Sequence, residues 1–342
     1  MISIKPRGFY TMYVNNRKVA EFENLVTDAG MRGFFERGSF LMHCRVGKGS
    51  TEPSYLDTQL QVPVATTSTT ATPVSPSGLP EFGRRRRVGD GWVDEIERAF
   101  AFSIGSVVGT ISEVCVGQFS TTSPYYNQQF MFSRALVRDL DGAPVSITVA
   151  ADEQLIVVYR YEHHVPAVDV SGISMSFGDI TRTARIRSLR PHFGTSYADF
   201  MSFTYGSVAR GSVSVGLRSL VATYQSSRSF GAFRGGVLTP EQLTQWLAGS
   251  PQGNTVNNLP TVTRRPNIPG AVVDRFSVTH RAQDGEIVIG GVVIGVRLDP
   301  GVHTDDARHA ALILSFDEPI VKTADQEFRL EVDITTRWRD PD

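Results

Sequence analysis

The fold is decided by Arg98-Ala-Phe-Ala-Phe102, Gly109-Thr-Ile-Ser-Glu-Val-Cys-Val-Gly117, Phe130-Met-Phe-Ser-Arg-Ala-Leu-Val-Arg-Asp139 and Ala151-Asp-Glu-Gln-Leu-Ile-Val-Val-Tyr-Arg-Tyr161, four strand candidates within the stretch Arg98–Glu162. Apolar residues alternate with others in these segments, which are rich in β-branched and aromatic residues and are bounded by Gly, Asp and Pro. This pattern is typical of a half-buried antiparallel sheet. The sequence therefore predicts a mainly β fold.

The composition is that of an ordinary globular protein. Of the 342 residues, 41% are hydrophobic and 20% are charged, and this length suggests roughly two domains. The formal net charge of −1 gives no reason to expect binding to nucleic acid or to an anionic membrane. No apolar run approaches the length that spans a bilayer, so no membrane insertion is predicted.

Two cysteines, Cys44 and Cys115, are too few for a disulfide framework and suggest a reducing compartment during assembly. Both lie in strand candidates, where a small buried thiol is the expected state. Met1–Pro6 lacks the apolar core of a signal peptide. A role at a virion or cell surface would therefore be reached by assembly and not by secretion.

The N-terminal region predicts a hairpin followed by a short helix. Phe9–Val14 and Lys18–Phe22 are strand candidates, and Asn15-Asn16 between them supplies the turn. The helix is predicted over Asn24–Phe35 with Asn24 as its N-cap, although its two glycines weaken it. Ser39–Val46 is predicted to be the next strand.

Residues 61–90 form a segment rich in Thr, Ser, Pro and Ala that predicts a long extended arm. The segment contains Arg84, Arg85, Arg86 and Arg87 near its end. These arginines have three interpretations: a nucleic-acid contact, which the near-neutral chain disfavours; docking onto acidic groups of a neighbouring subunit; or a solvated strand edge that resists aggregation. Both of the last two remain open.

The strongest helix signal lies at residues 240–248. Thr239 is in the N-cap position, Pro240 is the first helical residue, Gln242 completes a capping box, and Gly249 ends the helix. The rest of the chain after residue 166 is predicted to be mainly strands and loops. Strand candidates in it are Ser171–Phe177, Thr181–Arg187, Ala198–Tyr205 and Ser212–Leu217.

The four strand candidates return in the same order near the C-terminus, at separations of about 173 to 178 positions. The returning segments are Asp274–Val278, Gly285–Gly295, Ala310–Asp317 and Pro319–Val332, which parallel Arg98–Phe102, Gly109–Gly117, Phe132–Asp139 and Pro144–Tyr159. This order predicts a tandem duplication with a boundary near Pro166. The expected architecture is therefore two β-sandwich-like domains, residues 1–165 and 166–342, with one or two short helices.

Part of the first half resembles virion structural proteins of tailed bacteriophages, of the tail and tail-fibre type. The resemblance covers roughly residues 9–160 and is carried by five pieces in the order that those proteins show: Asn24–Gly30, Cys44–Thr58, Arg98–Phe102, Ile111–Gly117 and Phe132–Val137. The resemblance implies a β-rich structural subunit without enzymatic activity, in the tail or a tail fibre, that acts by oligomeric assembly. Two alternatives remain open: a receptor-binding tail-fibre or tip protein, and a neck, collar or head-attached appendage.

The same resemblance implies a location and partners. The chain would be assembled in the cytoplasm of the bacterial host and would reside in the virion. Its partners would be copies of itself, in a trimer or a higher ring, and other virion proteins. A receptor-binding role would add a glycan or protein of the host surface, for which Tyr125, Tyr126 and Asn127 form a candidate contact loop. An ordinary loop that connects two strands is the alternative for these residues.

No catalytic, cofactor-binding or metal-ligating set is predicted from the sequence. The densest carboxylates, Asp94–Glu97 and Asp305-Asp306, lie beside turns or loops. The adjacent His163 and His164 point to opposite faces of a strand and make a poor metal pair. Gly47–Ser50 lacks the glycine that a phosphate-binding loop needs five residues before its Gly-Lys pair. No cofactor is therefore expected.

Overall fold

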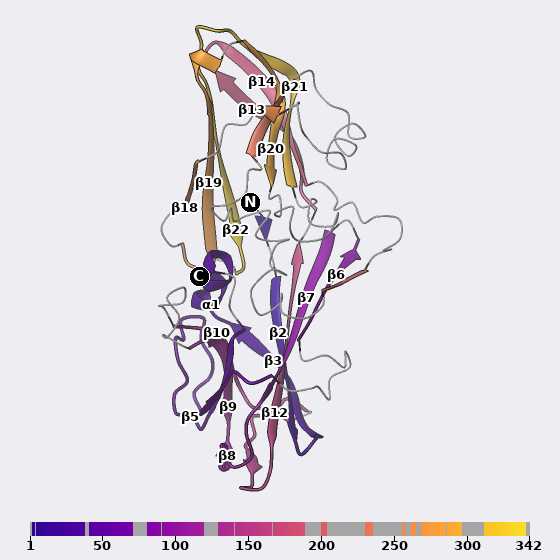
Figure 1. Ribbon diagram of the computed structural model, residues 1–342, viewed down its shortest axis with the longest axis vertical. Coiled ribbons are helices and arrows are strands. Elements are labelled where there is room, and N and C mark those ends of the chain that lie inside the picture. The colour runs from indigo at the N-terminus through magenta and orange to yellow at the C-terminus, as the bar shows by residue number, and fades with distance from the viewer. Residues whose placement is uncertain are drawn as a thin grey trace.

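The computed structural model describes residues 2–3, 5–37, 41–70, 81–89, 91–119, 129–139, 141–165, 167–188, 200–203, 230–234, 255–256, 261–264, 268–284, 286–295 and 311–339. The structure confirms the mainly β fold class, because strands account for most of it and helix for very little. The finer expectation of two β-sandwich-like domains stays a prediction. In Figure 1 the elements of the first half form the lower part of an elongated molecule, and most of those of the second half form the upper part.

The lower part is built on a sheet of ten strands in the order β15-β6-β7-β12-β2-β3-β10-β9-β4-β5. These strands are β2 (Lys5–Val14), β3 (Arg17–Val26), β4 (His43–Gly47), β5 (Pro63–Thr67), β6 (Glu81–Val88), β7 (Gly91–Ala101), β9 (Glu113–Gln118), β10 (Phe130–Leu136), β12 (Leu155–Val165) and β15 (Phe200–Phe203). A separate pair of strands joins β8 (Gly109–Ile111) to β11 (Ile147–Val149). The strand candidates of the opening stretch thus occur as β7, β8 with β9, β10 and β12.

The predicted hairpin is present as β2 and β3, and its turn is made by the expected asparagines. Asn15 has φ of 50° and Asn16 has φ of 65°. Two consecutive left-handed residues are the geometry of the two-residue turn that matches the twist of a hairpin, and Asn tolerates it better than most residues. The backbone N–H of Asn15 also donates to the carbonyl of Gln154, which ties the turn to the loop before β12.

The short helix α1 (Asp28–Arg37) begins later than the sequence suggested, and its cap is a different residue. Asn24 belongs to β3, so the prediction of Asn24 as N-cap is wrong. The Thr27 hydroxyl accepts a hydrogen bond from the backbone N–H of Gly30 at 2.9 Å and donates to the Met131 carbonyl at 2.6 Å. Thr27 therefore caps the helix, and the same hydroxyl bonds the helix to β10.

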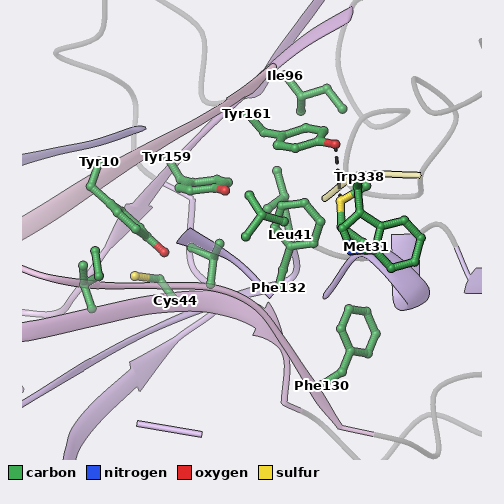
Figure 2. Close-up of a cluster of buried hydrophobic side chains, with 14 of the residues drawn as sticks. Tyr10, Met31, Leu41, Cys44, Ile96, Phe130, Phe132, Tyr159, Tyr161 and Trp338 are labelled. Carbon is green, nitrogen blue, oxygen red and sulfur yellow. Dashed lines mark hydrogen bonds between the residues drawn. The ribbon is translucent and has the colours of Figure 1, made fainter. Parts of the chain in front are cut away.

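The core forms where the ten-stranded sheet folds over on itself. β3 and β10 pair through only two pairs of residues, and this corner brings β10, β9 and β4 over β2 and β12. Phe132 of β10 meets the ring of Tyr161 edge to face, with the centroids 5.0 Å apart. Tyr10 lies 4.8 Å from Tyr159 between ring centroids and shares a 2.6 Å hydrogen bond with the Ser133 hydroxyl. Figure 2 shows these rings filling the space between the two layers.

The upper part contains two further sheets, in the orders β1-β22-β19-β18 and β13-β14-β21-β20-β16-β17. Their strands are β1 (Ile2–Ser3), β13 (Asp169–Phe177), β14 (Ile180–Ser188), β16 (Phe230–Arg234), β17 (Thr255–Val256), β18 (Thr261–Arg264), β19 (Ala271–His280), β20 (Ile287–Gly295), β21 (Ala311–Lys322) and β22 (Phe328–Arg337), with a 3-10 turn at Ala282–Asp284. The N-terminal β1 pairs with the C-terminal β22, and β15 of the second half pairs with β6. Each half therefore lends a strand to the other.

Strands that correspond to each other in the sequence repeat also form corresponding pairs. In the first half β7 pairs with β12 and β9 pairs with β10; in the second half β19 pairs with β22 and β20 pairs with β21. The registers differ by two residues, because Phe100 opposes Val157 in one half, whereas its counterpart Phe276 opposes Val332, the counterpart of Tyr159, in the other. The tandem duplication stays a prediction.

The segment expected as an extended arm contributes strands to the sheet. Of the segment 61–90, expected as an extended arm, Pro63–Thr67 and Glu81–Val88 are strands β5 and β6 of the ten-stranded sheet. A polar segment can join a sheet because ladder hydrogen bonds use the backbone alone. The predicted helix 240–248 and the strand candidate Ser212–Leu217 lie outside the described residues.

Candidate functional site

The most elaborate polar site in the described residues lies under the loop at residues 48–62. Glu113 of β9 is fully buried, and its carboxylate accepts hydrogen bonds from three backbone N–H groups of this loop. The donors are Gly49 at 2.9 Å, Val62 at 2.8 Å and Gln61 at 3.1 Å. One side chain thus holds both ends of the loop against the sheet.

Arg134 of β10 completes the site. Its guanidinium donates to Glu113 at 2.9 Å, to the Asp57 carboxylate at 2.7 Å and to the carbonyl of Thr51 at 3.0 Å. Burial opposes the charge of Arg134, but the hydrogen bonds to Asp57 and Glu113 outweigh this effect and raise its pKa. Because every charge here is paired and bonded, the network fixes the path of the loop at a low cost of burial.

Three of the five pieces expected to resemble phage virion proteins form this site, and a fourth contacts β10 beside it. Asn24–Gly30 contacts β10 through Thr27, whose backbone N–H donates to the Phe132 carbonyl at 2.9 Å. Cys44–Thr58 contributes the loop, Ile111–Gly117 contributes Glu113, and Phe132–Val137 contributes Arg134.

In the fifth piece, Arg98–Phe102, the Arg98 side chain forms its hydrogen bonds elsewhere, with residues before β4 and after β5. The Arg98 guanidinium donates to the Leu41 carbonyl at 2.5 Å. Sequence reasoning missed the roles of Glu113, Arg134 and Arg98, although one signal was present: each is a charged residue within an apolar strand. Charges in such positions are seldom buried without a partner.

A second polar site joins the two chain halves. The Asp28 carboxylate at the start of α1 accepts hydrogen bonds from the Trp338 indole N–H at 2.9 Å and from the Arg339 guanidinium at 3.0 Å. Arg339 also lies over the Tyr55 ring, 4.9 Å from its centroid. In Figure 2 Trp338 packs beside Met31 of α1. The C-terminal end therefore closes onto the helix and loop of the N-terminal half.

The four arginines at positions 84–87 lie in β6, between β15 and β7. β6 is thus not an edge strand, and the interpretation of these arginines as a solvated strand edge is wrong. The register sets Arg84 opposite Glu95 and Arg85 opposite Asp94, so acidic residues of the same chain occupy the neighbouring positions of β7. A contact of Arg84, Arg85, Arg86 and Arg87 with another subunit stays a prediction.

The candidate receptor loop, Tyr125, Tyr126 and Asn127, lies outside the described residues, as do Asp305 and Asp306. Within the described part of the chain, no group of three or more His, Cys, Asp or Glu side chains could hold a metal ion. No helix in that part is long and apolar enough to cross a bilayer.

The two cysteines occupy opposite faces of the sheet and are both fully buried. Cys44 belongs to the main core, whereas Cys115 packs with Leu60, Phe119 and Met131. Burial raises the pKa of both thiols, most strongly by removing the thiolate from water. Both are therefore in the protonated, unreactive form at neutral pH.

Comparisons with family models, curated proteins and solved structures found no match to this chain.

Proposed function

We propose that this chain is a structural subunit of a tailed-phage virion, in the tail or an attached fibre, and that it acts by oligomeric assembly without enzymatic activity. The proposal rests on the resemblance of residues 9–160 to virion proteins of that kind. The partners that we propose are copies of the same chain and other virion proteins.

The observation that best supports this proposal is the packing of four of the five resembling pieces at or beside one buried polar site. Glu113 and Arg134 use their charges to hold backbone groups and one another, which is a structural use of buried charge. A catalytic group would instead need to face a substrate in a cleft with a proton to exchange. A subunit that acts by contacting its neighbours needs a loop of fixed shape, and this network provides one.

The direct test is to look for the chain in purified particles of the phage whose genome encodes it. Virions labelled with an antibody to the chain and imaged in negative stain should carry label at one station of the tail or fibre. Label at the neck, the collar or the head would favour the appendage alternative. Particles that carry no label above that of a control antibody would contradict the proposal.

A separate experiment addresses the receptor-binding alternative. Purified chain would be mixed with host cells, and the bound fraction compared with that of a variant with Tyr125, Tyr126 and Asn127 changed to alanine. Saturable adsorption that the variant loses would assign host contact to this loop. Equal adsorption by both proteins would remove the loop from consideration.

A further inference from the structure

Strand β5 ends the ten-stranded sheet, and among the described strands it pairs only with β4. Cys44, Arg45 and Val46 of β4 oppose Thr67, Thr66 and Ala65 of β5 in continuous register. After Thr67 the chain turns inward, where the Thr69 carbonyl accepts a hydrogen bond from the backbone N–H of Ala101. Val62 does not belong to the open edge, because its N–H is bonded to Glu113 and its carbonyl to Lys48. Among the described strands, the edge left unpaired is therefore short and lies within Pro63–Thr67.

This edge is exposed and carries no charge. The side chain of Val64 is 38% exposed. From Thr58 to Thr70 the sequence contains no Asp, Glu, Lys or Arg. Sheets usually protect an open edge with charges, proline or a bulge, because its unpaired backbone groups can bind another strand. Here Pro63 and the bulge at Val64 lie at the first residues of the strand, and Ala65–Thr67 is regular.

A contrast within the molecule shows what a protected edge looks like. Strand β13 ends the six-stranded sheet and also has an exposed valine, Val170, which is 50% exposed. Next to it, Asp169 forms an exposed ion pair with Arg185 at 2.6 Å. A register shift after Val170, with Gly172 at φ of 76°, disrupts the strand close to these residues. β13 thus has the charge and the irregularity that β5 lacks along Ala65–Thr67.

We propose that β5 pairs antiparallel with β5 of a second copy of this chain, across a two-fold axis. An antiparallel pair of identical strands is self-complementary, since each strand offers the other the same donors and acceptors in reverse order. A charged strand would bring like charges together in such a pair, whereas this neutral strand brings together Val, Ala and Thr. Pairing also closes after two copies, so it extends the sheet without forming a fibre.

This inference rests on the proposed function, since it names the surface through which the proposed subunit contacts its own copy. A strand of this length buries too little surface for a tight complex by itself. The contact is therefore a weak dimer in solution, and it gains strength where other contacts in an assembly hold the two copies near each other.

Disulfide trapping tests the pairing. Val64→Cys and Thr66→Cys would be oxidised mildly, each alone and as a mixture, since the register decides which positions face each other. The native Cys44 and Cys115 are buried and do not compete. We expect a covalent dimer in at least one of the three samples. Val170→Cys is the matched control and should stay monomeric; equal cross-linking by the control would overturn the proposal.

A charge variant provides a second reading that does not depend on oxidation. Val64→Lys should shift the concentration-dependent sedimentation of the chain to that of a monomer, while Val170→Lys should leave it unchanged. Circular dichroism and the melting temperature establish that both variants are folded. A wild-type chain that is monomeric at every concentration overturns the β5 contact, but the virion role is then still decided by antibody labelling of particles. A chain that dimerises but is absent from virions supports the β5 contact and contradicts the virion role.

Discussion

The buried loop site of the N-terminal half and the outer faces of the sheets in the C-terminal half use charge in different ways. In the N-terminal half Arg134 and Glu113 are almost completely buried and bind each other and the backbone of one loop. In the C-terminal half the ion pairs of Arg185 with Asp169 and of Arg275 with Asp333 lie on the outside of the sheets and are substantially exposed. The difference teaches that similar strand pairings can carry either a fixed framework or a solvated surface.

Glu113→Ala should produce the largest loss, because it removes a buried carboxylate and leaves Arg134 and three backbone N–H groups with fewer partners. Breaking a buried pair in this way costs about 3–5 kcal/mol. Urea unfolding would measure the loss, and amide exchange should increase in residues 48–62. The control is Glu318→Ala, whose ion pair with Arg182 is exposed. A loss no larger than that of the control would remove the contrast between the halves.

Asp28→Asn should have the next largest effect, since it weakens the bonds that join α1 to Trp338 and Arg339. Weakening a buried, charge-assisted contact costs about 1–3 kcal/mol. Trp338→Phe removes the indole N–H without changing the helix, and the double variant measures the coupling of the two positions by urea unfolding. Strictly additive losses would mean that the C-terminal end does not join the halves through Asp28.

His43 should make the stability of the N-terminal half depend on pH. Burial, and then the charges of Arg98 and Arg45, hold the pKa of His43 below its usual value. Its Nδ1 accepts a hydrogen bond from the backbone N–H of Phe119, which requires the neutral ring. A lowered pKa in the folded state means that stability is complete above about pH 6.5, the unfolded value, and is lost as the pH falls below it.

The measurement is the urea midpoint from about pH 7.5 to about pH 5, on either side of the ordinary histidine pKa. His43→Gln keeps a side-chain acceptor and does not titrate, so its midpoint should fall less over this range than that of the wild-type chain. Parallel curves for the two proteins would show that the pKa of His43 is the same in the folded and the unfolded chain.

Arg185→Ala should have the smallest effect. The ion pair with Asp169 is short, at 2.6 Å, but both side chains are about half exposed and solvent screens their attraction. We expect no measurable change in the urea midpoint at physiological salt, with Arg329→Ala as a second exposed arginine for comparison. A loss comparable with that of Glu113→Ala would show that the surface of the C-terminal half is as tightly coupled as the core of the other half.

Local patterns in the sequence predicted much of the fold. The strands β7, β9, β10 and β12 follow from alternation, and the turn at Asn15 and Asn16 follows from the backbone freedom of asparagine. The helix cap was misplaced because Asn24 and Thr27 are both good capping residues, and the choice between them depends on carbonyls of β10 that lie about a hundred positions away. No local pattern contains that information.

The buried network was not predicted for the same reason. Glu113 and Arg134 meet because β9 and β10 pair and turn these residues toward one loop. The sequence shows a charge within each strand but not which strand lies beside it. The place of β5 and β6 in the sheet was also missed, because strand pairing of a polar segment depends on a free neighbouring edge and not on its own composition.

The structural role of this chain is tested most directly by its number of copies in purified virions, measured by quantitative mass spectrometry against a major capsid protein. We predict a fixed, reproducible copy number that is a small multiple of a ring or trimer and that survives extensive washing. A chain that is absent from the particles, or whose amount varies from one preparation to another, would contradict its role as a structural subunit.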